Sequence, residues 1–187
     1  MVEGARRARE ARFAAGLRAV GSALARIPRA WALGPVLGWA YVIWTLSSLP
    51  PTVTGSSEPW HSVLSNFAHA LEYGVLALWL ALLAPRRAGW PDLAPRVCAR
   101  LVAVVLVYAL SDEIHQSFTP GRDASVFDLL TDVLGGAFTL RVIASVGGPR
   151  AAPHELPGLF AWGILACLAS ALLASHVPEM FPALGWL

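Results

Sequence analysis

The chain has 187 residues, of which 56% are hydrophobic and only 14% are charged. Soluble domains usually contain about a quarter charged residues, so this composition excludes an ordinary soluble domain and predicts an integral membrane protein. The net charge of +2 is too small to indicate a nucleic-acid partner.

Residues 1–30 form a basic leading segment with seven arginines. Its apolar residues recur at helical spacing, at Phe13, Leu17, Val20, Leu24 and Ile27. This spacing predicts a helix with a narrow apolar stripe, which Pro28 should end. A helix of this kind would lie on the anionic inner leaflet of a membrane. An unstructured basic tail is the alternative interpretation.

Five apolar segments follow, and each is close to the ~20 residues that a membrane-crossing helix needs. They cover residues 31–49, 66–84, 101–118, 125–146 and 158–176. The fifth lies beyond a Gly- and Pro-rich break, so we interpret it as an addition to a four-helix core. The predicted fold is an all-α integral membrane protein with three parts: the basic segment 1–30, the core 31–146, and a loop, fifth helix and short tail at 147–187.

The placement of arginines predicts the orientation of these segments. The loop at 85–100 has four arginines and the last loop is flanked by Arg141 and Arg150, whereas the loop at 50–65 has none. Because cytoplasmic loops carry the excess of Lys and Arg, we expect a cytoplasmic amino terminus in the inner membrane of a cell. Arg122 is the one basic residue on the predicted outer side, so we expect it to have another role.

Polar residues concentrate near the predicted outer ends of three helices, where the i, i+3, i+4 rule places them on shared faces. The second segment carries Ser65, Asn66, His69, Glu72 and Tyr73 on one face. The third carries Tyr108, Asp112 and His115, with Ser111 and Gln116 at the margins and Glu113 pointing away from His115. The fourth carries a stripe of Ser125, Asp128, Asp132, Gly135 and Thr139.

These polar groups are predicted to lie below the outer headgroups. If Arg100 marks the inner edge, Asp112 lies ~18 Å and His115 ~22 Å along the helix, within a hydrocarbon layer ~30 Å thick. An unpaired charge at such a depth costs at least ~2.5–3.5 kcal/mol. We therefore expect the polar groups of the three helices to face one another across a pocket that opens outward.

The segment between the third and fourth helices predicts a tight turn at Pro120–Gly121, because glycine supplies a positive φ. Such a turn would hold Arg122 over the outer mouth of the bundle. Ser125 is a predicted N-cap of the fourth helix, with Asp128 at the third position as in a capping box. The small pair Gly135 and Gly136 is expected to permit close helix packing.

The stretch SDEIHQSFTPGRDASVFDLLTDVLGGAFT resembles the VanZ-like family, whose pattern is roughly DE-x-x-Q-x-F-x-P-G-R followed by an Asp and a run of small residues. Upstream, SSLPP and NFAHALEYGVLAL resemble the S-x-x-P and H-x-x-x-Y segments of that family. The resemblance covers about residues 44–146, with departures at Asn66 and Asp132. It implies a four-helix membrane core with a polar site open to the outer face, a link to teicoplanin-type antibiotic resistance, and a lipid-headgroup activity proposed by analogy.

One hypothesis is an enzyme that modifies a phosphate-bearing lipid or lipid-linked headgroup. His69 or His115 could act as base or nucleophile because imidazole titrates near neutrality. Arg122 could clamp a phosphate with two parallel hydrogen bonds. The catalytic candidates are His69, Glu72, Asp112, Glu113, His115, Arg122 and Asp128. The substrate-binding candidates are Asn66, Tyr73, Gln116, Arg122, Ser125 and Asp132.

No cofactor is specified by the sequence, although a divalent cation could be held by Asp112, His115, Asp128 and Asp132. Their spacing matches no established metal motif. A second hypothesis is binding without turnover, of a lipid-linked wall precursor or a glycopeptide-type antibiotic. A transporter is a third, disfavoured because the polar groups gather on one side of the membrane. Purely structural roles are the remaining alternative, with Glu113 pairing with Arg122 and Asp128 only capping its helix.

Overall fold

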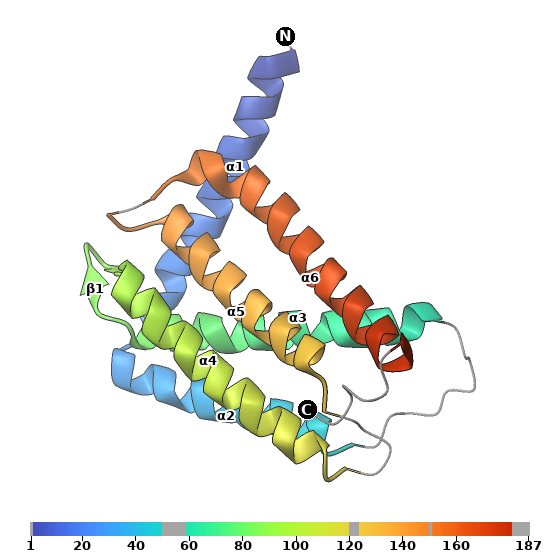
Figure 1. The fold of residues 1–187 in the computed structure, drawn as a ribbon. Helices are drawn as coiled ribbons and strands as arrows, with labels where there is room; N and C mark the ends of the chain where they lie inside the picture. Colours follow the sequence, from blue (N-terminus) through green and yellow to red (C-terminus); the bar gives the residue numbers. More distant parts are fainter. Residues whose placement is uncertain (1, 50–58, 120–123, 150, 181–187) are drawn as a thin grey trace.

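A computed structural model describes residues 2–49, 59–119, 124–149 and 151–180. Within these residues the chain forms six α-helices (Figure 1). They are α1 (Val2–Leu24), α2 (Leu33–Ser47), α3 (Pro59–Leu83), α4 (Pro95–Gln116), α5 (Val126–Val146) and α6 (Leu156–Met180). A hairpin of β1 (Arg86–Arg87) and β2 (Trp90–Pro91) joins α3 to α4, and short 3₁₀ turns at Arg29–Ala32 and Pro153–Glu155 precede α2 and α6. The predicted all-α class is confirmed.

Four of the five predicted spans coincide with helices that are long and apolar enough to cross a membrane. These are Arg29–Ser47, Val63–Leu83, Val126–Val146 and Pro153–His176. The chain is thus a multi-pass membrane protein. The third predicted span, α4, has a comparable length but carries Arg96, Arg100, Asp112 and Glu113 near its two ends. Its outward face is nevertheless apolar, since Val104, Val107, Leu110 and Ile114 are all exposed.

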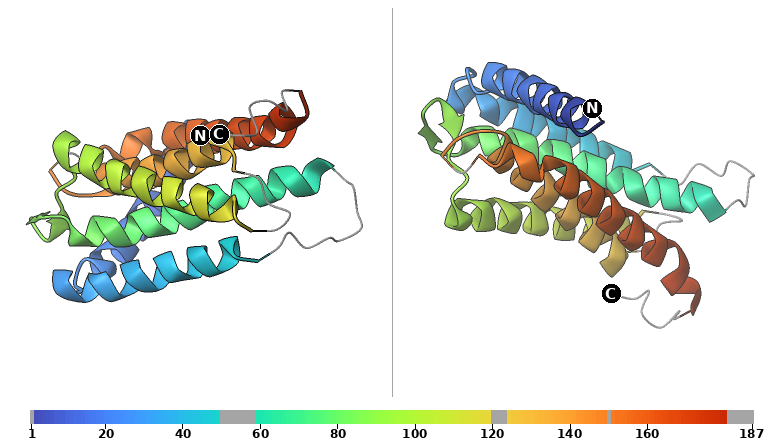
Figure 2. Two further views of the ribbon diagram at one scale, coloured as in Figure 1. Left: turned by 60° about the horizontal axis from the view of Figure 1, so that its bottom comes forward. Right: turned by 90° about the horizontal axis from the view of Figure 1, so that it is seen from above.

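The helices pack around a central pair formed by α3 and α5 (Figures 1 and 2). On one side α2 packs against α3 and α4, and on the other α6 packs along α5 and α3. The fifth predicted span therefore joins the bundle directly, although it follows a Gly- and Pro-rich break in the sequence. Hydrogen bonds support this contact, because Thr131 donates to Ser170 (2.8 Å) and Asn66 donates to Ser175 (3.2 Å).

Glycines allow the two central helices to approach unusually closely. A Cβ atom added at Gly135 of α5 would lie 2.1 Å from the backbone oxygen of Ala70 in α3. At Gly136 an added Cβ would lie 3.0 Å from the side chain of Val105 in α4. The two neighbouring glycines thus face two different helices, in agreement with the packing role predicted from the sequence.

The end of the bundle that holds the hairpin is locked by tryptophan and arginine side chains. Trp90 is 6% exposed and packs against Gly21 of α1 and against Gly147 and Gly148, which follow α5. Its indole nitrogen donates to the carbonyl of Ile143 (3.1 Å). Both central residues of the hairpin turn, Ala88 and Gly89, have positive φ, as a two-residue type I′ turn requires.

Two arginines close the same end by satisfying backbone carbonyls. Arg29 donates from Nε (3.0 Å) and Nη2 (2.7 Å) to the carbonyl of Leu83, the last residue of α3. Arg86 donates to the carbonyl of Ile27, just beyond α1. Helix-terminal carbonyls lack partners within the helix, so these bonds both cap the chain and bind the elements together.

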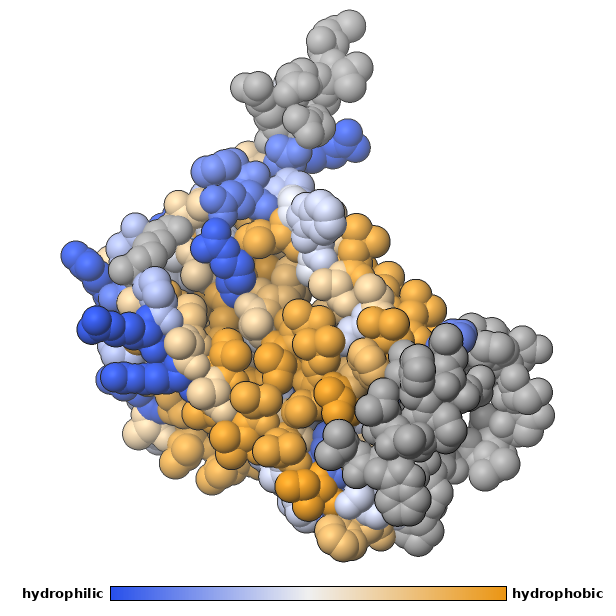
Figure 3. All heavy atoms as spheres, viewed as in Figure 1, coloured by the Kyte–Doolittle hydropathy of each residue, from blue (hydrophilic) through white to orange (hydrophobic). Residues whose placement is uncertain are grey.

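Helix α1 extends further than its apolar stripe predicted, and its amino-terminal half projects beyond the bundle (Figure 1). Its inner part packs on the start of α6, where the rings of Phe13 and Phe160 meet edge to face with centroids 5.6 Å apart. Figure 3 shows apolar residues across the middle of the visible face and hydrophilic residues gathered at the edge where the hairpin lies. The molecule therefore has a basic end and an apolar waist.

Candidate polar site at the opposite end of the bundle

Most of the predicted site residues that the structure describes lie at the end of the bundle away from the hairpin. This end is formed by the last turn of α2, the first half of α3, the last turns of α4, the first turns of α5 and the second half of α6. Arg122 and the Pro120–Gly121 turn lie outside the described residues. The polar side chains divide into one group between α2 and α4 and a second group between α3 and α5.

Asp112 is the centre of the group between α2 and α4. Its side chain is fully buried, and its Oδ2 accepts hydrogen bonds from Ser47 Oγ (2.8 Å) and Gln116 Nε2 (3.1 Å). The other oxygen, Oδ1, accepts no hydrogen bond within the described chain. Asp112 and Gln116 are four residues apart and so share one face of α4. One oxygen of this carboxylate is therefore fixed, and the other remains available.

His115 faces α2 instead of the other predicted catalytic residues. Its ring stacks on Trp44 with centroids 3.8 Å apart, and its Nε2 lies 2.9 Å from Ser48 Oγ. The Ser48 hydroxyl also lies 2.7 Å from the carbonyl of Trp44, so it can donate to either of these two acceptors, and the tautomer of His115 decides which. His115 therefore lies against α2, whereas His69 of α3 lies against Asp132 of α5.

The group between α3 and α5 contains a buried histidine and aspartate. His69 Nδ1 lies 3.4 Å from Asp132 Oδ1, and the side chains are 12% and 0% exposed. The contact is within ion-pair range but is not aligned as a hydrogen bond, and neither oxygen of Asp132 accepts one within the described chain. Tyr73, one turn below His69, is fully buried, and its hydroxyl is likewise without a hydrogen-bond partner there.

The close approach of α3 and α5 explains why these two side chains meet. His69 precedes Ala70, and Asp132 is three residues before Gly135, so both lie beside the Ala70–Gly135 contact. Asp132 is also within electrostatic range of Asp112 and Asp128. The two polar groups are therefore electrostatically connected. They form one acidic region around the largely buried ring of His69, which also lies within electrostatic range of Glu72.

Glu113 connects α4 to the start of α5. Its Oε2 accepts a hydrogen bond from the backbone nitrogen of Ser125 (2.6 Å), and only 4% of the residue is exposed. Ser125 is the N-cap predicted from the sequence, because its hydroxyl accepts from the backbone nitrogens of Phe127 and Asp128. In a capping box the acid at the third helical position would accept from the N-cap nitrogen. Here Glu113 of the preceding helix takes that role from Asp128.

We expect Glu113→Ala to destabilise the protein by about 2 kcal/mol, because a buried hydrogen bond is lost and the Ser125 nitrogen loses its acceptor. Glu113→Gln keeps an acceptor oxygen and should cost clearly less. Thermal unfolding in detergent can be followed with a thiol-reactive dye, since Cys98 and Cys167 are thiols that form no disulfide within the described residues. Equal losses for the two variants would contradict this assignment.

The remaining candidates have more varied surroundings. Asn66 turns toward α6, where it donates to Ser175. Glu72 is half-buried, and its backbone carbonyl accepts from the indole of Trp39 (2.8 Å). Sequence reasoning missed the contribution of α2, although Ser47 and Ser48 lie in the SSLPP motif that it singled out. It also missed Ser170 and Ser175, for which an apolar segment with isolated serines gives little signal.

The four residues considered as ligands for a divalent cation are not grouped together in the described structure. Within the described residues, no three His, Cys, Asp or Glu side chains are grouped closely enough to hold a metal ion. The reason is geometric, because His115 turns to Trp44 and Ser48 while Asp132 faces His69. Asp112, His115, Asp128 and Asp132, the residues named for a cation if one is bound, therefore do not meet as one group within the described part of the chain.

The amino-acid sequence matches the model of a known protein family. The VanZ/LLP1 family model matches residues 28–146, which is more than half of the chain and includes α2 to α5. The chain belongs to the VanZ/LLP1 family. Neither a curated protein nor a solved structure gives a match.

The VanZ/LLP1 match covers both polar groups and excludes α1 and α6. Within it, the Ser of SSLPP and the Asp and Gln of SDEIHQ bind one another as Ser47, Asp112 and Gln116. The Glu of SDEIHQ, Glu113, instead holds the start of α5. In this VanZ/LLP1 protein the motif residues therefore divide between shaping the polar site and joining its helices.

Proposed function

We propose that this VanZ/LLP1 protein is a membrane-embedded enzyme that modifies the headgroup of a phosphate-bearing lipid or lipid-linked precursor at the outer leaflet. The observation that supports the proposal is the buried contact between His69 and Asp132 in two helices that can cross a membrane. Asp132 is fully buried, and neither of its oxygens accepts a hydrogen bond within the described chain.

Energetics favour a functional reading of this pair. An ionisable group inside a membrane costs at least ~2.5–3.5 kcal/mol, and such groups are usually retained for a function. Buried polar atoms normally have partners, so several unsatisfied carboxylate oxygens in one place call for an explanation. Within the described residues, Asp112 Oδ1 and Glu113 Oε1 also lack hydrogen-bond partners, like both oxygens of Asp132. A ligand with polar hydrogens would supply the missing donors.

The proposed chemistry is proton transfer by His69. Asp132 beside Nδ1 favours the tautomer that carries its proton there, which leaves Nε2 able to accept one. His69 would take a proton from an attacking water or hydroxyl and return it to the leaving oxygen. Arg122 lies three residues before Ser125 in the sequence, and we assign it the phosphate. Without that cation the acidic region would repel an anionic headgroup.

The proposed orientation places the amino terminus in the cytoplasm and the polar site on the outer side of the inner membrane. It is supported by the arginines of the hairpin end, which include Arg29, Arg86, Arg96 and Arg141, since cytoplasmic segments carry the excess of positive charge. Labelling of single cysteines from either side of sealed membranes tests it. Accessibility of the hairpin from the outside would contradict the proposal.

The experiment that tests the reaction compares wild type with His69→Gln and Asp132→Asn, both close in shape to the native residue. Each purified protein is placed in vesicles that contain phosphate-bearing lipids, and headgroup products are measured by mass spectrometry. We expect each variant to lose at least about a hundredfold in rate, since positioned acid–base groups contribute about 10²–10⁴. His176→Gln is the matched control, because this ring is exposed and its hydrogen bond joins it to Leu172 of its own helix.

Two results would contradict the enzyme proposal. If vesicles with the wild-type protein have the same headgroup composition as empty vesicles, the protein does not catalyse the proposed reaction. Retention of a lipid-linked precursor or a glycopeptide antibiotic without turnover would instead support the alternative of a binding protein. In that case His69→Gln should weaken retention and leave all headgroups unchanged.

A further inference from the structure

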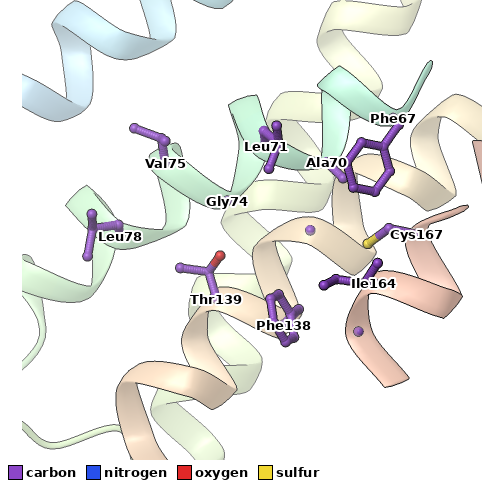
Figure 4. A pocket seen from close by; sticks show the side chains of 12 residues that line it. Phe67, Ala70, Leu71, Gly74, Val75, Leu78, Phe138, Thr139, Ile164 and Cys167 are labelled. Atoms are coloured by element: carbon purple, nitrogen blue, oxygen red, sulfur yellow. The ribbon is translucent and has the colours of Figure 1, made fainter. Parts of the chain in front are cut away.

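An apolar cavity of about 280 Å³ lies between α3, α5 and α6, with Ala70 and Gly135 in its wall (Figure 4). Its walls include Phe67, Leu71, Leu78, Phe138, Ile164 and Cys167. Leu71 is 62% and Ile164 45% exposed, whereas Cys167 is 4% exposed. The cavity therefore runs from the outer surface of the bundle into its interior.

The cavity has the length and depth of one bilayer leaflet. Along α3 it extends from Phe67 to Leu78, eleven residues that rise ~16 Å, about half of a ~30 Å hydrocarbon layer. It begins at the level of His69, two residues from Phe67, and leads away from the polar end. A molecule with its polar part near His69 would therefore have its apolar part beside this cavity.

The lining identifies the chemistry of the occupant. It offers two phenyl rings and several aliphatic side chains, and among the side chains that line the cavity only Thr139 and Cys167 carry a hydroxyl or a thiol. Such a lining cannot satisfy a headgroup, because buried polar groups without partners are costly. All three bordering helices can cross a membrane, so the exposed side of the cavity meets lipid chains.

We propose that this cavity seats one hydrocarbon chain of the phosphate-bearing lipid whose headgroup is modified at His69 and Asp132. The inference rests on the proposed function, and it adds that the substrate is recognised partly by its chain. A chain held there is ordered along α3 and α5, and this order fixes where its headgroup can lie. The glycines at 74, 135 and 163 keep the three helices close enough to form a narrow slot.

The test uses a phosphate-bearing diacyl lipid with a photoactivatable group midway along one chain, in vesicles that contain the full-length protein. Crosslinked residues are identified by mass spectrometry. We expect labelling to concentrate on the lining, at Leu71, Val75, Ile164 and Cys167, over the equally apolar exposed face of α4. Val75→Trp should reduce labelling about tenfold, which is the effect of losing contact with about two methylene groups.

Val107→Trp is the matched control, because Val107 is 67% exposed on α4 and lies outside the cavity lining. Labelling spread evenly over the apolar faces, or unchanged by Val75→Trp, would overturn the proposal. A second probe that has the same chain but no phosphate separates the two proposals. If this probe labels the cavity as strongly as the phosphate-bearing probe does and no headgroup turnover occurs, the chain site is supported and the proposed reaction is contradicted. Turnover that continues unchanged in Val75→Trp would leave the reaction and remove the chain site.

Discussion

Gly135→Ala is expected to destabilise the protein by about 3 kcal/mol, the upper part of the usual range for overpacking. The added Cβ would lie 2.1 Å from the carbonyl oxygen of Ala70, which is backbone and cannot rotate away. The two central helices must therefore separate. Because His69 and Asp132 meet beside this contact, their pairing and any reaction that depends on it should be lost as well.

Gly38→Ala is the matched control for this change. Gly38 lies within α2, and a Cβ added there meets no atom within 4 Å. Alanine is the better helix former by about 1 kcal/mol, so this variant should be neutral or slightly more stable. Unfolding of both variants in detergent, followed through Cys98 and Cys167, gives the comparison. A Gly135→Ala protein as stable as Gly38→Ala would show that α3 and α5 do not approach as described.

Trp90→Ala should produce the other large effect, a loss of about 3–5 kcal/mol. The indole is 6% exposed and fills the space beside Gly21, Gly147 and Gly148. Its removal also leaves the Ile143 carbonyl without this donor. Because the ring joins α1 to the segment after α5, the change should release α1 before the bundle itself unfolds.

Limited trypsin digestion provides a local measurement, since cleavage at Arg18 within α1 should become faster in Trp90→Ala. Trp162→Ala is the control, because Trp162 is 75% exposed and its loss removes little packing. It should change stability and cleavage only slightly. Faster cleavage without any change in the unfolding temperature would mean that the indole holds α1 but adds nothing to the bundle.

Much of the helical framework follows from the sequence because local rules determine it. Apolar run lengths predicted the spans, and Ser125 was correctly expected to cap α5 because an N-cap depends on only a few neighbouring residues. The helix at the amino terminus was also predicted, although α1 begins well before the apolar stripe at Phe13. Gly135 and Gly136 were expected to allow close packing, and their neighbours Ala70 and Val105 confirm it.

The partners of the polar residues could not be predicted in the same way. Helical periodicity states which residues share a face, but the rotation of α4 between α2 and α5 decides what each one meets. That rotation directs His115 to Trp44 and turns Glu113 toward Ser125. The packing of α6 was equally hidden, since its contacts depend on Ser170 and Ser175 meeting distant residues. Such contacts depend on tertiary packing, which local sequence patterns do not specify.

The contacts of Trp90 with Gly21, Gly147 and Gly148 also constrain the order in which the protein folds during synthesis. Residues 21 and 90 leave the ribosome well before residues 147 and 148, yet all four positions form one contact. Helix α1 can therefore complete this contact only after the segment that follows α5 has emerged. During that interval its arginines can rest on anionic lipid headgroups. Docking of α1 would then mark the completion of the hairpin end of the bundle during biosynthesis.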